Sequence, residues 1–158
     1  MPRKDITMTS EEIQAFLESS HTLQVATNGH DGRPHLAPMW FVMEDDRVVF
    51  RSFSKSQKIV NLRRDQNLTV LAERGLAYAE LQGVMIRGTA VLVDDPEYVL
   101  GLYGRLAAKY PMVGDAPVTL EPAALEEIFG GHATKNTAVI VEPEKITSWD
   151  HTKLGGVY

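Results

Sequence analysis

The fold class of this chain is decided by residues 23–53, LQVATNGHDGRPHLAPMWFVMEDDRVVFRSF. β-Branched and aromatic residues are frequent in three parts of this stretch, which predicts strands at 23–27, 35–43 and 47–53. The two segments between these strands are dense in Gly, Asp, Asn and Pro, which predicts turns. Because the connections are short, we expect neighbouring strands to pair as an antiparallel meander.

Outside the meander, the spacing of apolar residues predicts both strands and helices. Further strands are expected at 68–73, within a long β region at 76–93, at 137–141 and at 145–149. Helices are expected at 10–19, 56–65, 96–109 and 122–129, the last one ended by Gly130 and Gly131. Six or seven strands with few, short helices favour a mainly β fold, a barrel or closed sheet, in one domain over residues 1–158.

Two kinds of residue interrupt the predicted strands. Gly83 and Gly88 lie inside the region 76–93, where a glycine suggests a bulge or a close approach of the backbone. Pro38 lacks the N–H that a central strand needs, so it predicts an edge strand or a bulge. Such a strand can present backbone groups to a planar ligand, and Trp40 next to it has two open roles, stacking on a ligand or packing in the core.

Composition narrows the class of protein. The chain has 158 residues, of which 44% are hydrophobic and 23% charged, as is usual for a globular domain. It has no cysteine, which excludes disulfides, thiolate catalysis, iron–sulfur clusters and cysteine zinc sites. No secretory signal pattern and no apolar stretch of about 20 residues is present, so we expect a cytoplasmic protein without membrane contact.

The distribution of charge indicates one anion site. The net charge of −5 argues against nucleic-acid binding. Between residues 51 and 64, however, there are five cations and no acid. These cations indicate either a site for an anion or, as the ordinary alternative, a helix face exposed to solvent.

Several common sites are absent from the sequence. There is no G-x-G-x-x-G motif, no Walker A motif and no G-x-S-x-G elbow. The five histidines are scattered without ligand spacing, so we expect no catalytic metal. The strand–helix junction at residues 50–64 is the remaining candidate for a functional site.

This junction has the composition of a phosphate site. A helix N-terminus offers unpaired N–H groups and a partial positive charge. Ser52, Ser54 and Ser56 add hydroxyl donors there, and the cations Arg51, Lys55 and Lys58 surround them. The alternative is a capped helix with surface cations. A third feature, the stretch from Trp149 to Gly156, is predicted either to close a pocket or only to dock the C-terminal tail.

Taken in order, these features resemble the pyridoxamine 5′-phosphate oxidase-like flavin-binding split barrels. The resemblance is closer to the branch that uses the deazaflavin coenzyme F420, and it covers about residues 9–158. The matching stretches are Val25–Thr27, Asp31–His35, Pro38–Phe41, Phe50–Ser52, Ser56–Lys58, Asn61–Asp65, Gly83–Gly88 and Trp149–Gly156.

The resemblance implies a six-stranded antiparallel split β-barrel that forms a homodimer with its cofactor sites at the interface. It implies a phosphate loop and a strand that lies along the ring of the cofactor. The tail is implied to reach a cofactor or substrate, often across the dimer. The cofactor-binding residues it implies are His35, Leu36, Ala37, Pro38, Met39, Trp40, Arg51, Ser52, Ser56, Gln57, Lys58, Asn61, Trp149 and Lys153.

The sequence also departs from the oxidases proper. Those enzymes carry Arg and Lys where this chain has His35 and Trp40, and a ring-contacting Gln where it has Gly83. Their C-terminal R-x-H-x-R motif is missing here. True pyridoxamine phosphate oxidase activity is therefore not expected.

The function implied is hydride transfer between F420 and a small organic substrate, which requires alignment more than acid–base groups. Lys55, Arg63 and Arg64 are candidate partners for the acidic tail of F420. His35, His151 or solvent would supply a proton. The alternatives are an FMN-dependent oxidase or reductase of the same fold, and a non-catalytic barrel that holds a flavin or haem.

Overall fold

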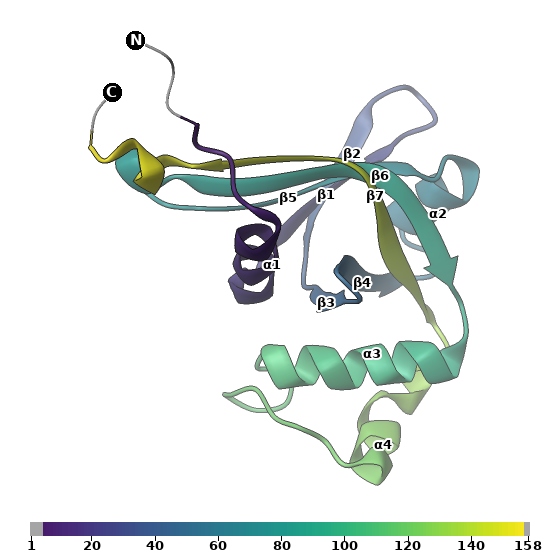
Figure 1. Cartoon of the computed structure of the whole chain (residues 1–158). Coiled ribbons are helices and arrows are strands. Elements are labelled where there is room, and N and C mark those ends of the chain that lie inside the picture. The colour runs from purple at the N-terminus through teal and green to yellow at the C-terminus, as the bar shows by residue number, and fades with distance from the viewer. Residues whose placement is uncertain (1–4, 157–158) are drawn as a thin grey trace.

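The computed structural model describes residues 5–156 and is built on one antiparallel sheet (Figure 1). The sheet has seven strands where the resemblance implied six, and their order is β2-β1-β5-β6-β7-β4-β3. The strands are β1 Leu23–Asn28, β2 Pro34–Met39, β3 Val42–Glu44, β4 Arg47–Phe53, β5 Asn67–Arg74, β6 Gln82–Val93 and β7 Asn136–Asp150. Residues 23–53 form two hairpins, β1–β2 and β3–β4, and the prediction of one antiparallel meander is wrong because β2 and β3 lie at opposite edges of the sheet.

The sheet curls into a split barrel because of one short link. β2 and β3 are the two outer strands, yet only Trp40 and Phe41 separate them in the chain. Two residues span little distance, so the sheet must bend until its edges approach each other. Pro38 therefore lies on an edge strand, as predicted.

The prediction of one continuous strand over 35–43 is wrong. The amide of Phe41 donates a hydrogen bond to the Tyr110 hydroxyl at 3.1 Å, and the carbonyl oxygens of Phe41 and His21 lie 3.1 and 2.9 Å from the same hydroxyl. These hydrogen bonds replace the strand-to-strand hydrogen bonds that a continuous strand would make at this position. The strand is therefore broken by a tyrosine from a distant part of the chain.

The prediction of two strands after residue 136 is also wrong, because β7 is continuous through Pro143. Gly88 pairs with Pro143 at a register shift between Arg87 and Gly88, and this irregularity tolerates the missing N–H of proline. A Cβ on Gly88 would lie 2.1 Å from the Glu142 carbonyl oxygen. The predicted close backbone approach at Gly88 is thus confirmed.

The helices follow their predictions closely in three of four cases. They are α1 Ser10–Ser19, α2 Gln57–Arg64, α3 Pro96–Lys109 and α4 Pro122–Ala133, with short 3₁₀ turns η1 Tyr78–Glu80 and η2 His151–Leu154. α4 continues through Gly130 and Gly131 instead of ending there. Burial of Phe129 and Ala133 offsets the cost of about 1 kcal/mol for each glycine.

Two 3₁₀ turns replace structure that was expected to be strand or irregular. Residues 78–80 form η1, so the β region begins at Gln82 and not at residue 76. The tail forms η2 as far as Leu154, and the last two residues of the predicted irregular tail lie outside the described residues. No helix within residues 5–156 has both the length and the apolar character needed to cross a membrane.

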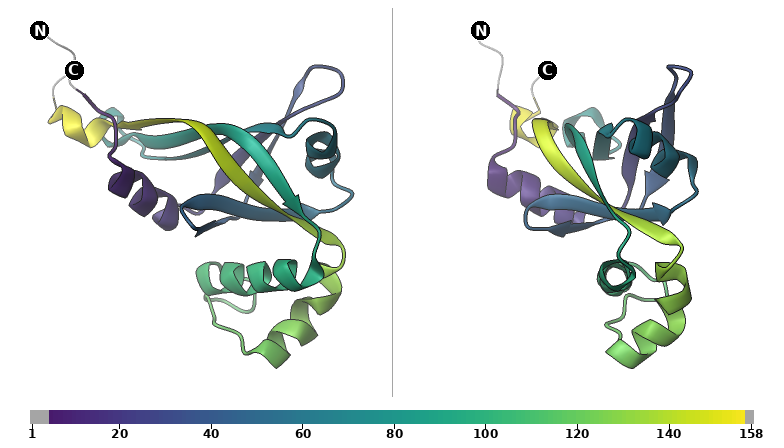
Figure 2. Two further views of the ribbon diagram at one scale, coloured as in Figure 1. Left: turned by 45° about the vertical axis from the view of Figure 1, so that its right-hand side comes forward. Right: turned by 90° about the vertical axis from the view of Figure 1, so that its right-hand side faces the viewer.

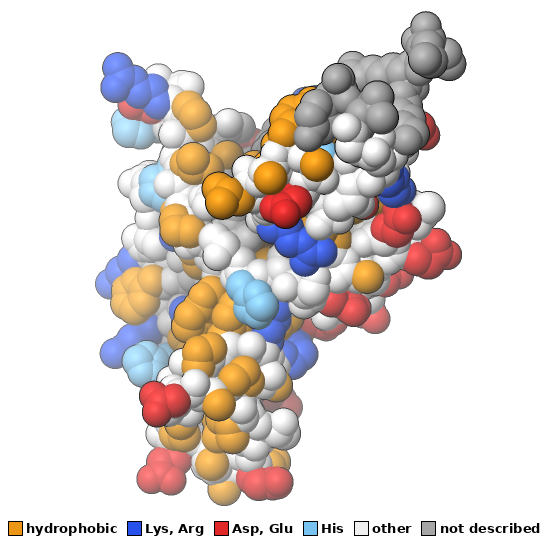
Figure 3. Space-filling model, turned by 90° about the vertical axis from the view of Figure 1, so that its left-hand side faces the viewer, with side chains coloured by type: hydrophobic (Ala, Val, Ile, Leu, Met, Phe, Trp, Pro, Cys, Tyr) orange, Lys and Arg blue, Asp and Glu red, His pale blue; other side chains and the backbone are white. Residues whose placement is uncertain are grey.

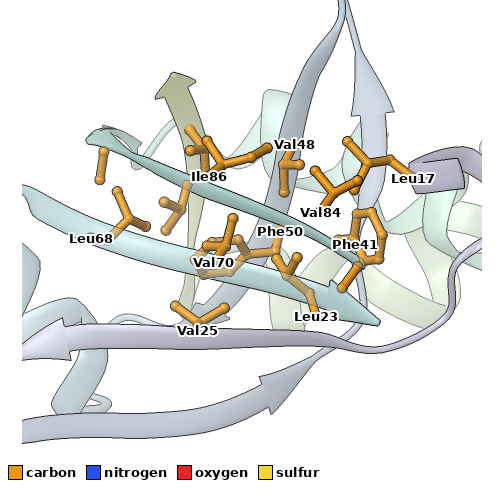
Figure 4. Packing of buried hydrophobic residues seen from close by; sticks show 14 of the residues in the cluster. Leu17, Leu23, Val25, Phe41, Val48, Phe50, Leu68, Val70, Val84 and Ile86 are labelled. Carbon is orange, nitrogen blue, oxygen red and sulfur yellow. The ribbon is translucent and has the colours of Figure 1, made fainter. Parts of the chain in front are cut away.

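The apolar side chains form two layers. One cluster fills the barrel and includes Leu23, Val48, Phe50 and Val84 (Figure 4). A second cluster lies between the barrel and the pair α3–α4, which packs below the sheet in both views of Figure 2. Alternate residues of β4 serve the two layers, so its two faces meet different surroundings.

Candidate functional site

The junction between β4 and α2 is a tight turn at the end of a strand. The Ser56 amide donates to the Phe53 carbonyl at 2.8 Å, and the Ser54 amide donates to the Lys135 carbonyl at 2.9 Å. Ser56 is extended, with φ −66° and ψ 154°, and acts as the N-cap of α2. The predicted helix start at this serine is confirmed.

The hydroxyl groups of the junction do not cap the helix. Ser56 makes no side-chain cap bond, and its Oγ lies 2.9 Å from Ser52 Oγ. Lys58 Nζ donates to Ser52 Oγ at 3.2 Å. The first turn of α2 contains no acidic residue. Three side-chain donors and the uncapped N–H groups of α2 therefore converge without an anion of the protein itself.

The electrostatics of Lys58 fit the same interpretation. Partial burial lowers the pKa of Lys58 below its ordinary value, and no ion pair of residues 5–156 involves it. A cation that has lost part of its hydration without a counter-ion is stabilised by an incoming anion. This donor set matches a phosphate group.

Asn61 fixes the orientation of α2 against the barrel. It is fully buried, and its Nδ2 donates to Thr27 Oγ1 at 3.1 Å. Gln57 Nε2 donates to Asn61 Oδ1 at 2.8 Å, and Arg64 Nη2 lies 3.4 Å from the same oxygen. Thr27 was named from the sequence only within the matching stretch Val25–Thr27 and not as a site residue, because a threonine is common in a strand.

Three predicted site residues line one pocket next to this helix. His35, Gln57 and Asn61 border a pocket of about 240 Å³ together with Gly29, His30, Asp31, Arg33 and Pro34. The Nδ1 atom of His35 is buried and has no hydrogen-bond partner within residues 5–156. The structure thus brings the start of β2 to the side of the junction.

The other end of β2 borders a second pocket. Pro38, Met39 and Trp40 line a volume of about 300 Å³ with Thr22, Arg51 and Leu106. The Trp40 ring stacks on Tyr110, with 4.6 Å between ring centroids and 11° between planes, and 44% of the residue is exposed. Trp40 is a half-exposed pocket wall, so the core role predicted for it is wrong, whereas stacking on a ligand stays a prediction.

Leu36 and Ala37 lie between these two pockets on β2. Leu36 is 66% exposed, and Ala37 points to the opposite face of the strand. An exposed leucine on an edge strand is available to a ligand or to another chain.

Arg51 does not share the junction with Ser52. Adjacent residues of a strand point to opposite faces, and Arg51 lies on the face toward α3 and α4. Its guanidinium is 4.3 Å from the Tyr103 ring centroid, and Nη1 donates to Asn136 Oδ1 at 3.1 Å. The structure therefore separates Arg51 from the group formed by Ser52, Ser56 and Lys58.

The predicted residues of the tail lie far from the junction. η2 and α2 are at opposite ends of the sheet (Figure 1). Trp149 packs over Gly83, where an added Cβ would be 2.1 Å from the indole ring, so the predicted close approach at Gly83 is confirmed. Lys153 Nζ donates to Glu12 Oε2 and to the Thr7 carbonyl, each at 2.7 Å. Within one chain the tail is docked.

The remaining cations and histidine named from the sequence are placed as follows. Arg63 pairs with Asp94 at 2.8 Å, whereas Lys55 is exposed. Arg64 donates to the Asn28 carbonyl. His151 Nδ1 is 2.7 Å from the Tyr78 carbonyl oxygen at the tail end. Among residues 5–156, no group of three or more His, Cys, Asp or Glu side chains has the arrangement of a metal site.

A curled antiparallel sheet with a phosphate-type junction after its fourth strand defines a class, the split β-barrels that bind flavin or deazaflavin cofactors. The family model described as pyridoxamine 5′-phosphate oxidase matches residues 9–150. The chain belongs to this family.

Solved structures agree with this assignment. A conserved hypothetical protein, Rv2991, from Mycobacterium tuberculosis is 35% identical, with a TM-score of 0.84 over 100% of this chain and 94% of the other. Two more distant structures share the fold. One described as an F420 reductase is 21% identical, with a TM-score of 0.64 over 85% of this chain and 94% of the other.

The second distant structure is an FAD binding protein from Mycobacterium smegmatis. It is 21% identical, with a TM-score of 0.60 over 89% of this chain and 95% of the other. No curated protein matches the chain.

Proposed function

We propose that this protein is an oxidoreductase that binds coenzyme F420 and exchanges a hydride with a small organic substrate. The observation that carries the proposal is Lys58, a partly buried cation that contacts the Ser52 hydroxyl at the N-terminus of α2 and has no carboxylate partner among the described residues. A phosphate group would complete this set of donors.

The residues of the junction would hold the cofactor phosphate. Lys58 and the hydroxyls of Ser52 and Ser56 would bind its oxygens, and Gln57 and Asn61 would border it from the adjoining pocket. Arg51 is left out because its side chain lies on the other face of β4. When bound, the deazaflavin supplies a hydride donor or acceptor, which no side chain of this chain provides.

β2 would lie along the cofactor ring. It is an edge strand, and its two ends border the two pockets next to the junction and next to Trp40. Leu36 would contact the ring with its exposed side chain. For the proton, His35 is the nearer histidine to the junction because it shares a pocket with Gln57, whereas His151 lies at the tail.

The choice of F420 rests on two observations of different weight. The fold is shared with a protein described as an F420 reductase. Lys55 and Arg64 lie near α2 and would meet the acidic tail of F420. FMN remains the second candidate, because Arg63 is already paired with Asp94 and because the fold is shared with an FAD binding protein.

We also propose a homodimer in which the tail of one chain meets the junction of another. Within one chain the end of β7, which carries Trp149, and η2, which carries Lys153, lie at the opposite end of the sheet from α2 (Figure 1), so only a second chain could bring them to the cofactor. Large apolar side chains are exposed at Leu36, Trp40, Phe53 and Val60. Figure 3 shows a further gathering of apolar side chains over the helical layer, flanked by acidic ones.

The test is a calorimetric titration of the purified protein with F420 and, in parallel, with FMN at matched salt. We expect tighter binding of F420, followed by measurable oxidation of reduced F420 when reducible substrates are added. Selective binding of FMN would indicate that the protein uses a flavin and not F420. Binding without any turnover would support the non-catalytic barrel, and binding of neither cofactor would refute the proposal.

A further inference from the structure

A cavity of about 270 Å³ lies on the face of β4 opposite the junction. It opens between the sheet and the pair α3–α4. Its lining consists of Arg51, Phe53, Tyr103, Met112, Phe129, His132 and Asn136. Its floor comes from the neighbouring strands β4 and β7, which place Phe53 opposite Asn136.

The charged group of this cavity is Arg51, and its hydrogen-bonding capacity is largely unused. Only Nη1 has a partner, Asn136 Oδ1 at 3.1 Å, and Nε is buried without any partner within residues 5–156. Asn136 cannot offer more, because its Nδ2 donates to the His132 carbonyl at 2.9 Å. No carboxylate of the described residues pairs with Arg51.

A guanidinium in this position is costly unless an anion joins it. Burial lowers the pKa of Arg51, and the Tyr103 ring at 4.3 Å offsets only part of the lost hydration. Charged side chains that are buried are normally paired. Arg51 is partly buried, and an anion from outside the described residues would complete its pairing.

The wall of the cavity is aromatic. Tyr103 and Phe129 stack with 4.6 Å between ring centroids and 21° between planes, and the His132 ring lies 6.3 Å from that of Tyr103. Met112 and Phe53 complete an apolar surface next to the cation. Such a wall accepts a flat apolar body by stacking.

We infer that this cavity binds a small monocarboxylic acid with a flat apolar body, with its carboxylate on Arg51. The planar fork of a guanidinium suits two carboxylate oxygens, and one cation matches one negative charge. The volume is below the range of about 300–1,000 Å³ for drug-sized ligands, which limits the acid to the size of one or two fused rings. The inference does not depend on the phosphate site, because Ser52 and Lys58 face the other side, although Arg51 also lines the pocket beside Trp40.

The experiment is an NMR titration of the full chain with benzoate and, in parallel, with benzamide, which has the same shape but no charge. We expect benzoate to shift the resonances of residues around the cavity and to bind at least tenfold more tightly than benzamide. Arg51→Met should reduce benzoate affinity at least tenfold. Arg51→Lys keeps the charge but not the fork and should reduce it severalfold.

Two controls make the result interpretable. Lys55→Met removes an exposed cation on the same chain and should leave benzoate affinity unchanged. If Arg51→Met does not fold, Arg51→Lys carries the comparison. Equal affinity for benzoate and benzamide, or equal benzoate affinity in the wild type and the Arg51 variants, would overturn the inference. An unchanged ratio of FMN to riboflavin affinity in these variants would show that the phosphate site stands apart, because this ratio reports only the phosphate.

Discussion

The lysines at the two ends of the sheet have different hydrogen-bond partners. Lys153 at the tail end donates to the Glu12 carboxylate and to the Thr7 carbonyl. Among residues 5–156, Lys58 at the α2 end contacts only the Ser52 hydroxyl, beside a helix N-terminus that no side chain of these residues caps. Both residues looked like site residues in the sequence. The difference shows that a paired cation holds the fold together, whereas an unpaired one beside free donors is available to a ligand.

The largest expected effect is the loss of cofactor affinity when the unpaired Lys58 is replaced. Lys58→Ala should weaken binding of F420 or FMN by about 10- to 100-fold, because a charge-assisted bond to phosphate contributes about 1.5–3 kcal/mol. Lys55→Ala is the matched control in the FMN titration, since Lys55 is an exposed cation on the same junction and FMN lacks the acidic tail that Lys55 is proposed to meet. Calorimetric titration measures both. Equal losses in the two variants would mean that only the overall positive charge matters.

The tail end should respond in stability. Gly83→Ala places a Cβ 2.1 Å from the Trp149 ring and should lower the free energy of unfolding by about 1.5 kcal/mol through overpacking. Gly101→Ala in α3 is the control, because its Cβ would meet nothing within 4 Å, and alanine favours a helix. Urea denaturation compares the two. An unchanged Gly83→Ala variant would contradict the docked position of Trp149.

Lys109 sharpens the comparison, because it is an unpaired cation away from the junction. Its Nζ is buried without a partner, 4.0 Å from the Phe41 ring centroid, and burial lowers its pKa to about 8. Since the unfolded chain binds this proton more tightly, the free energy of unfolding should rise with pH between about 8 and the ordinary lysine value of 10.5.

Lys109→Met should therefore stabilise the protein at pH 7, by about 1 kcal/mol once partial exposure is allowed for. The difference in the free energy of unfolding between this variant and the wild type should shrink as the pH rises above 8, because the wild-type lysine then loses its charge. Urea denaturation at pH 7 and pH 10 measures this. A constant difference at both values would contradict the burial of the charge.

The smallest effect belongs to the paired lysine. Lys153→Met removes a partly exposed ion pair and should cost no more than about 1 kcal/mol of stability. Cofactor affinity should also fall if the tail of a second chain reaches the junction, as the dimer proposal requires. Light scattering with and without cofactor gives the oligomeric state. A monomeric protein with unchanged cofactor affinity would show that the tail of a second chain does not reach the junction.

Local signals predicted much of the fold. The strands β1 and β4, the helix 96–109 and the edge position of Pro38 follow from patterns within a few residues. The break after Met39 does not, because its cause is Tyr110, which reaches Phe41 across 69 residues of sequence. The continuity of β7 through Pro143 likewise depends on a register shift against Arg87 and Gly88 of β6, a neighbour that the sequence does not specify.

The candidate site was predicted in composition and only partly in geometry. Ser52, Ser56 and Lys58 meet as expected. Arg51 was grouped with them, although the alternation of side chains along a strand already separates it from Ser52. Tyr103 was missed as a cavity wall because an apolar position on a helix is the same in the core and beside a ligand.

One measurement tests the central claim, that the junction at Lys58 holds a phosphate, most directly. It compares the affinities of FMN and riboflavin, which differ only in the phosphate, in the wild type and in Lys58→Ala. The account predicts that FMN binds at least tenfold more tightly than riboflavin to the wild type and that this ratio falls toward one in the variant. The same ratio in both proteins would contradict a phosphate site at Lys58.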